Sequence, residues 1–181
     1  EEKLRPFFQL EKVVEGVFAH AQKLFSLKFK SNAKIPVYHS QVRVYEVSKE
    51  NTGEFIGLLY MDFFPRESKK GGAWATNFYE QGAYRDESKG SQVLLRPHVG
   101  IVCNFTPATP DKPSLLSLDE VETLFHEFGH ALHSLLSRCH YRSLAGTNVY
   151  WDFVELPSQI MENWVTEKEA LDLFAHHYKT G

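Results

Sequence analysis

The residues best suited to chemistry form the segment His126-Glu127-Phe128-Gly129-His130. Residues four positions apart share one face of an α-helix, so His126 and His130 can direct imidazole nitrogens at one metal ion about 2.0–2.1 Å away. Zinc binds imidazole ligands well and keeps one coordination position for water. It lowers the pKa of that bound water to about 7. Glu127 would lie beside the ion, where a general base can take the proton of the water. The pattern predicts hydrolysis by a metal-activated water.

A helix from Ser117 to about Arg138 is expected to present these side chains. Ser117 and Glu120 have the spacing of a capping box, and Asp119 and Glu120 favour the positive end of the helix dipole. The face opposite the histidines is apolar and carries Val121, Leu124, Phe125, Phe128, Leu132 and Leu135. A chance match to the motif would not need one apolar face and one face that carries metal ligands. The five motif residues alone, however, also fit a helix with two surface histidines and a glutamate.

A third ligand is needed, and two residues compete for the position. His133 follows His126 by seven residues, about 10.5 Å along a helix axis at roughly 1.5 Å per residue, so an ion held between 126 and 130 is out of its reach. His133 is therefore interpreted as a residue that packs or orients a ligand. Glu155 begins the next predicted helical segment, and an antiparallel helix could bring its carboxylate to the open side of the metal. Glu155 is the better candidate.

The remaining sequence predicts helices around a small sheet. Apolar residues at helical spacing predict helices over 6–29 and 154–178 besides the central one. Alternating apolar residues and turn signals predict strands at 41–47, 55–64, 73–79 and within 92–105, with a hairpin over 41–64. The predicted fold class is α+β: a small, mostly antiparallel sheet packed with helices, including the motif helix and a following helix that carries Glu155.

Composition excludes several classes of partner. The chain has 181 residues and a formal net charge of −3, so nothing in it indicates nucleic-acid binding, and no apolar run approaches the roughly 20 residues of a membrane span. Cys103 and Cys139 form no C-x-x-C pair; we expect two small buried side chains without a disulfide, which fits a reducing compartment. The ends, without an initiator Met or signal peptide, suggest an excised piece of a larger protein.

Longer stretches around the motif resemble one family. These are LFHEFGHALH at 124–133, GTNVYWDFVELPSQIMENW at 146–164, MDFFPR at 61–66, GGAW at 71–74 and RPHV at 96–99. They look like the thimet oligopeptidase and dipeptidyl carboxypeptidase family of zinc metallopeptidases, nearest the bacterial dipeptidyl carboxypeptidases. The likeness spans essentially the whole chain.

The resemblance implies zinc on His126, His130 and Glu155, with Glu127 as catalytic base. It also implies a larger, mostly helical enzyme in which two halves enclose a channel that admits short peptides, with residues 1–181 as its single central metal-binding segment. The expected compartment is the cytoplasm, with the periplasm as the alternative. The family's tyrosine that stabilises the tetrahedral intermediate comes from a downstream region outside this chain, so the 181 residues alone are expected to hold metal but to be poorly active.

Two other functional readings stay open, as do the roles of several residues. The chain could be a zinc-holding structural or binding module without turnover, or a helical interaction domain with a fortuitous motif. Residues 71–74 are either a cleft edge to which substrate adds as a strand or a loop with a core Trp. Three carboxylates could each orient a ligand histidine or be merely solvated: Glu122, Asp152 and Glu162. We expect ordinary histidines at His98, His140, His176 and His177, and a solvated loop at Lys69-Lys70.

Overall fold

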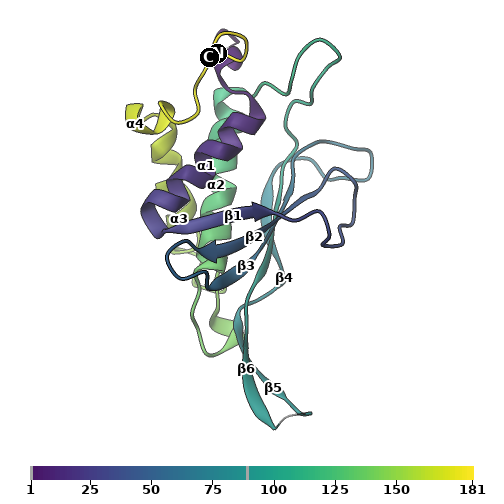
Figure 1. The fold of residues 1–181 in the computed structure, drawn as a ribbon, viewed down its shortest axis with the longest axis vertical. Coiled ribbons are helices and arrows are strands. Elements are labelled where there is room, and N and C mark those ends of the chain that lie inside the picture. The colour runs from purple at the N-terminus through teal and green to yellow at the C-terminus, as the bar shows by residue number, and fades with distance from the viewer. Residues whose placement is uncertain (1, 89) are drawn as a thin grey trace.

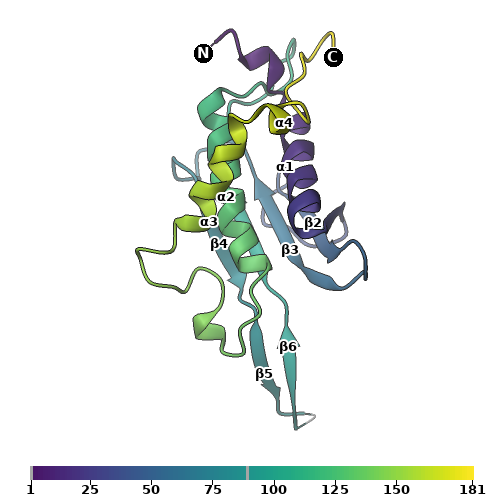
Figure 2. The same cartoon turned by 90° about the vertical axis from the view of Figure 1, so that its left-hand side faces the viewer.

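The computed structural model describes residues 2–88 and 90–181, which form helices on one face of a sheet and a projecting hairpin (Figures 1 and 2). The strands are β1 (Leu27–Ser31), β2 (Arg43–Lys49), β3 (Phe55–Asp62), β4 (Trp74–Tyr79), β5 (Gly82–Asp86), β6 (Ser91–Leu95) and β7 (His98–Val102). The α-helices are α1 (Leu10–Phe25), α2 (Leu118–Leu135), α3 (Leu156–Glu162) and α4 (Lys168–Leu171). Three short 3-10 helices complete the elements: η1 (Arg5–Phe7), η2 (Arg142–Leu144) and η3 (Asn163–Val165).

The main sheet has five strands in the order β1-β2-β3-β7-β4, and β5 pairs with β6 in a separate hairpin. Neighbouring strands are antiparallel except β3 and β7, which are parallel. The expected α+β class and mostly antiparallel sheet are therefore confirmed, as is the hairpin of β2 and β3. The topology leaves β4 at one edge of the sheet, where α2 packs beside it.

The helix predicted over residues 6–29 is too long. It ends at Phe25 because Ser26 adopts a left-handed conformation with φ of 53°. Residues 27–31 instead form β1, whose backbone pairs with β2. Leu27 and Phe29 alternate with lysines there, a period of two that suits a strand with one buried face.

The helix predicted over residues 154–178 is also wrong, because it is broken into α3, η3 and α4. Glu167 is extended, with φ of −79° and ψ of 131°, and separates η3 from α4. The break lets Val165, Ala170 and Phe174 all reach the core. The strand predicted within 92–105 is present as β7, whereas β6 and its pairing with β5 were not anticipated.

Helix α2 is held at both ends. At its start the expected capping box is present: the Glu120 N–H donates to Ser117 Oγ over 3.1 Å, and the Ser117 N–H donates to the Glu120 carboxylate over 2.8 Å. At its end Arg96 donates to the Leu135 carbonyl over 2.6 Å and to the Ser137 carbonyl over 3.1 Å. These contacts satisfy terminal backbone groups and fix the helix that carries the histidines.

The loop between β3 and β4 is anchored by a buried ionic cluster, which corrects the expectation of a solvated Lys69. The Lys69 side chain is only 2% exposed, and its ammonium donates to Asp62 Oδ1 over 2.9 Å. Arg66 donates twice to the same carboxylate, over 2.8 Å each, and the Tyr38 hydroxyl donates over 3.0 Å. Burial alone would raise the pKa of Asp62, but the hydrogen bonds from Arg66, Lys69 and Tyr38 outweigh it and lower that pKa to about 2.

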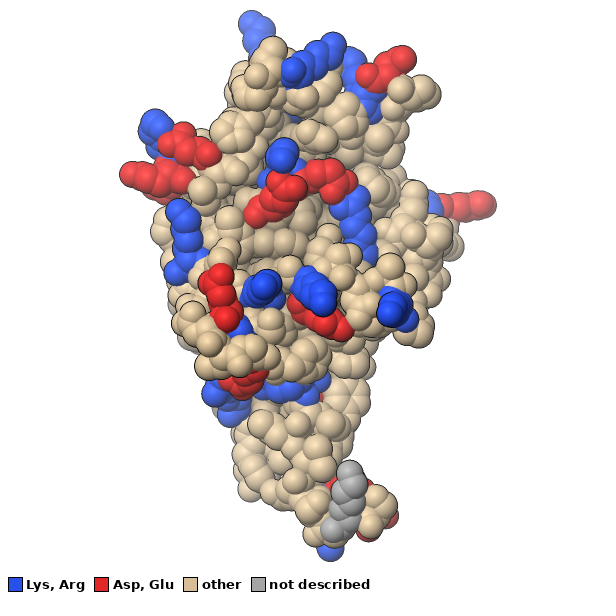
Figure 3. Space-filling model, in the orientation of Figure 1, with Lys and Arg blue, Asp and Glu red and all other residues tan. Residues whose placement is uncertain are grey.

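On the face in Figure 3, basic and acidic side chains are interspersed over the body of the molecule. Within residues 2–88 and 90–181, none of the helices combines the length and the apolar character that a membrane crossing requires.

Candidate metal centre

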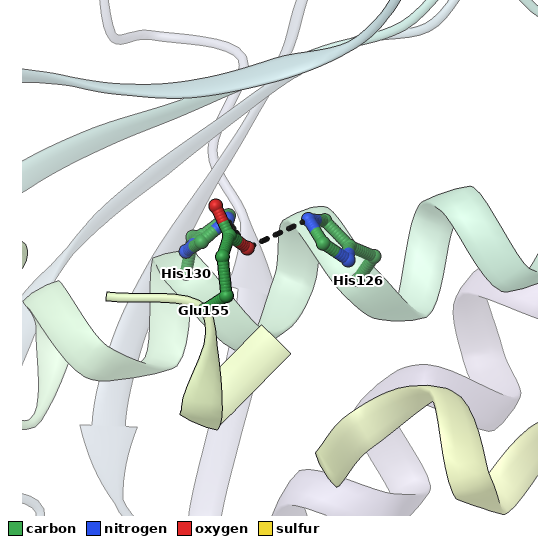
Figure 4. Close-up of side chains that lie close together, drawn as sticks. All are labelled: His126, His130 and Glu155. Carbon is green, nitrogen blue, oxygen red and sulfur yellow. Dashed lines mark ion pairs between the residues drawn. The ribbon is translucent and has the colours of Figure 1, made fainter. Parts of the chain in front are cut away.

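The structure brings His126, His130 and Glu155 together, although Glu155 is distant in sequence (Figure 4). Glu155 Oε2 lies 3.2 Å from His126 Nε2 and 3.1 Å from His130 Nε2. Bonds of about 2.1 Å to a tetrahedral ion would hold its ligand atoms roughly 3.4 Å apart. The separations in this cluster are therefore close to those that one shared ion imposes.

The protonation states also suit a metal. Burial lowers the pKa of His130, which favours the neutral imidazole that can coordinate an ion. A hydrogen bond from Ser158 lowers the pKa of Glu155, which favours its carboxylate form. Two imidazoles and one carboxylate are a donor set typical of catalytic zinc.

Glu162 orients His126 from the far end of α3. Its Oε1 lies 2.5 Å from His126 Nδ1, so a proton on Nδ1 leaves the lone pair of Nε2 facing Glu155. Of the three carboxylates considered from the sequence, Glu162 fills this position. Within the described part of the chain, Glu122 and Asp152 are exposed and make no hydrogen bond or ion pair with either histidine.

Two neighbours of the cluster were not found from the sequence. The fully buried Ser158 donates its hydroxyl to Glu155 Oε2 over 2.7 Å and holds that carboxylate in place. Gly129 lies against the backbone of α3, where an added β-carbon would come 2.6 Å from the Pro157 carbonyl oxygen. A glycine inside an otherwise strong helical pattern was the available signal for this close approach.

Glu127 lies beside the cluster and is only 6% exposed. Burial raises the pKa of Glu127 to about 7; His126 acts against this rise, Glu155 adds to it, and a hydrogen bond with the Ala75 backbone opposes it. Among the described residues, its Oε2 has no hydrogen-bond partner. The side chain of Glu127 therefore has a proton affinity suited to acid–base work near neutral pH.

A cleft of about 430 Å³ opens over these groups. One wall is the edge strand β4, and the other is α2 with the segment that leads into α3. The half-buried Trp74 and Ala73 line it, so the cleft-edge interpretation of residues 71–74 fits better than a loop with a core Trp. The lining residues include Ala75, Thr76, Asn77, His126, Glu127, His130, Ser134, Thr147, Val154 and Glu155.

His133 lies outside the cluster, as the helix geometry predicts. Its ring packs edge-on against Phe153, with the centroids 6.2 Å apart. Both cysteines are free, but the expectation that both are buried is wrong for Cys139. Cys139 is partly exposed because it lies in the segment after α2 rather than in the core.

Comparison with known proteins agrees with this geometry. A sequence model of the family described as "Peptidase family M3" matches residues 1–181. The chain is 46% identical to the dipeptidyl carboxypeptidase of Escherichia coli (strain K12), 42% identical to oligopeptidase A of the same strain, and 44% identical to the probable cytosolic oligopeptidase A of Arabidopsis thaliana. Each alignment covers 100% of this chain but only 25%, 26% and 26% of the relative, so the chain spans about a quarter of their length.

Proposed function

The chain belongs to peptidase family M3, and from that premise we propose that it is the metal-binding catalytic segment of a zinc-dependent peptidase that cleaves short peptides. The observation that carries the proposal is the meeting of His126, His130 and Glu155 beside Glu127 on the floor of a cleft. The names of the relatives, dipeptidyl carboxypeptidase and oligopeptidase, support the same substrate class.

In this proposal His126, His130 and Glu155 hold the zinc ion. Bound zinc would supply a Lewis acid and an acidified water. Glu127 accepts a proton from that water and passes it to the leaving amine. Glu162 keeps His126 in the tautomer whose Nε2 can coordinate, and Ser158 fixes the Glu155 carboxylate.

The substrate would lie extended along β4. Edge strands offer backbone N–H and C=O groups to a further strand, and a peptide added there pairs through its own backbone whatever its side chains. The Ala75 backbone contacts Glu127, so a peptide bond next to this part of β4 would lie within reach of the base. This mode of binding suits flexible short peptides, because a folded protein seldom presents a free extended segment.

We also propose that residues 1–181 are the central segment of a longer, mostly helical polypeptide, because they span only about a quarter of the relatives. On its own the segment is expected to bind zinc but to turn over little substrate. Losing one oxyanion donor costs about 2.7–4 kcal/mol, and lost positioning of the peptide adds to that cost. A cytoplasmic location is proposed from the two free cysteines and the cytosolic relative.

An assay with quenched-fluorescence peptides tests the proposal in the zinc-loaded full-length protein. We expect hydrolysis that a chelator abolishes and that Glu127→Gln removes while zinc stays bound. Zinc binding without any turnover would favour the alternative, a zinc-holding structural or binding module. The 181-residue chain is assayed in parallel, and turnover comparable to that of the full-length protein would show that the segment is sufficient.

A further inference from the structure

A second cavity adjoins the edge strand β4, and we call it the β4 pocket. Its volume is about 340 Å³, and its lining includes the loop between β3 and β4 and the even-numbered residues of β4. Trp74 and Thr76 line both this pocket and the cleft over the candidate metal ligands. The two cavities therefore meet along the open edge of β4, where the substrate would add as a strand.

The β4 pocket lies on the face of the sheet that points away from the helices. A β-carbon added at Gly100 of β7 would come 3.3 Å from Thr76 Cγ2 and 2.9 Å from Phe78 Cε2. The next residue of β7, Ile101, is fully buried in the core that the sheet forms with the helices, and successive side chains of a strand take opposite faces. A peptide added along β4 would likewise present its side chains alternately to the metal cleft and to the β4 pocket.

The β4 pocket extends from the edge of the sheet towards its interior. Trp74 of β4 is opposite Val102 of β7, and Val102 is in turn beside Asp62 of β3. Strands about 4.8 Å apart put Asp62 about 10 Å from Trp74 in this row, and all three residues line the pocket. A peptide side chain that enters beside Trp74 therefore points towards the ionic cluster around Asp62.

The β4 pocket carries more positive than negative charge. Arg66, Lys69 and Lys70 line it together with a single carboxylate, that of Asp62, which leaves two positive charges in excess. The buried Lys69 ammonium already donates to Asp62 and to two backbone carbonyls. Arg66 is 21% exposed and gives Asp62 only two of its five N–H groups. Lys70 is exposed, and among the described residues no carboxylate forms an ion pair with it. Arg66 and Lys70 can therefore bind a further carboxylate.

The walls of the β4 pocket are held in place by the fold. Asn104 Nδ2 donates to the Lys70 carbonyl over 2.9 Å and to the Gly72 carbonyl over 2.7 Å, which fixes the loop where it leads into β4. On the other side the ring of Tyr38 packs edge-on against Phe78, with the centroids 6.0 Å apart. Little conformational freedom would be lost when a ligand binds between such walls.

Resting on the proposed peptidase function, we propose that the β4 pocket is a substrate subsite in which Arg66 and Lys70 bind an acidic side chain of the peptide. Trp74 and Thr76 flank Ala75, whose backbone contacts Glu127. The acidic residue is therefore one or two positions from the scissile bond. The subsite sets a charge preference for the substrate and takes no part in proton transfer.

The test compares Glu with Gln at each position of an otherwise neutral quenched-fluorescence peptide, in the zinc-loaded full-length protein. The two side chains have nearly the same shape and the ends of the peptide stay unchanged, so the ratio of the two kcat/KM values reports the side-chain charge alone. In the wild type this ratio is expected to reach about ten at one position, one or two residues from the cleaved bond. Lys70→Glu should remove or reverse the preference, whereas Lys70→Arg, which keeps the charge, should retain it.

Lys28→Glu is the matched control, because it makes the same change of net charge. Lys28 is exposed on β1, at the opposite edge of the sheet, and its replacement should leave the ratio at the wild-type value. A wild type without the preference for Glu, an unchanged ratio in Lys70→Glu, or an equal loss in Lys28→Glu would overturn the subsite and leave the peptidase intact. A wild type that hydrolyses no peptide would overturn the proposed function and the subsite with it. Zinc content and melting temperature, measured for each variant, identify any loss caused by misfolding.

Discussion

Gly129 lies so close to Ser158 that a β-carbon added at position 129 would come 2.5 Å from the Ser158 Cα. The contact joins the middle of the motif helix to the helix that follows Glu155. Because Ser158 also holds the Glu155 carboxylate, the same contact carries the third candidate ligand to the two histidines. Gly129, which lies between the two motif histidines in the sequence, thus contributes to the site through packing.

Gly129→Ala is expected to destabilise the protein despite the higher helix propensity of alanine. Propensity alone would favour Ala by about 1 kcal/mol, whereas overpacking against a fixed backbone costs about 1–3 kcal/mol. Urea unfolding followed by circular dichroism measures the change, and zinc affinity should fall with it. Gly71→Ala is the control, since nothing lies within 4 Å of a β-carbon there. A Gly129→Ala variant as stable as the wild type would contradict the proposed steric role.

Zinc binding is expected at one ion per chain. Alanine at His126, His130 or Glu155 should each lower zinc content after dialysis against a dilute chelator, because two remaining donors hold the ion weakly. His133→Ala on the same helix is the control and should keep its zinc. Atomic emission gives the metal per chain, and anomalous scattering at the zinc edge locates it. Zinc bound by His133 in place of Glu155 would refute the assignment.

Glu127→Gln should lower kcat in the full-length protein by about 10²–10⁴ while zinc content stays unchanged. Glutamine keeps the shape of the side chain but cannot accept the proton of the water. Glu122→Gln, an exposed change on the same helix, should have no effect. Peptide hydrolysis within tenfold of the wild type would remove Glu127 from the role of base.

Glu162→Ala should weaken zinc binding about 10- to 100-fold, because His126 loses the acceptor that fixes its tautomer and ring orientation. Competition with a fluorescent zinc chelator measures the affinity, with Glu122→Ala as the matched control. If both variants bind zinc equally well, the contact between Glu162 and His126 does not support the metal site.

Acid should weaken the loop that leads into β4. The pKa of Asp62 is about 2 in the folded chain, below its ordinary value of 3.8, so its carboxylate stabilises the fold fully above about pH 4 and loses this effect as the pH falls towards 2. The shift corresponds to about 2 kcal/mol. Unfolding free energies measured from pH 5 to pH 2 should fall more steeply for the wild type than for Asp62→Asn. Parallel slopes would mean that Asp62 is not the group responsible.

Local rules account for what the sequence alone determined. The i, i+4 spacing of His126 and His130 and the capping box at Ser117 depend only on helix geometry, and both features are present in the structure. The turn between β2 and β3 is similarly local. The rise of a helix per residue and the family resemblance both favour Glu155 over His133 as the third ligand. The structure brings Glu155 to the two histidines.

Only the tertiary structure decided the features that depend on what packs across from a residue. Lys69 belongs to a polar stretch that predicts a solvated loop, yet its side chain is buried because Asp62 pairs with it from the end of β3. Leu27–Ser31 leaves the predicted helix because β2 offers it a partner strand. Gly129, Ser158 and Trp74 acquire their places from a helix contact or a sheet edge formed by segments distant in sequence. A local pattern encodes which face a side chain takes, but its neighbour on that face is fixed only when the layers pack together.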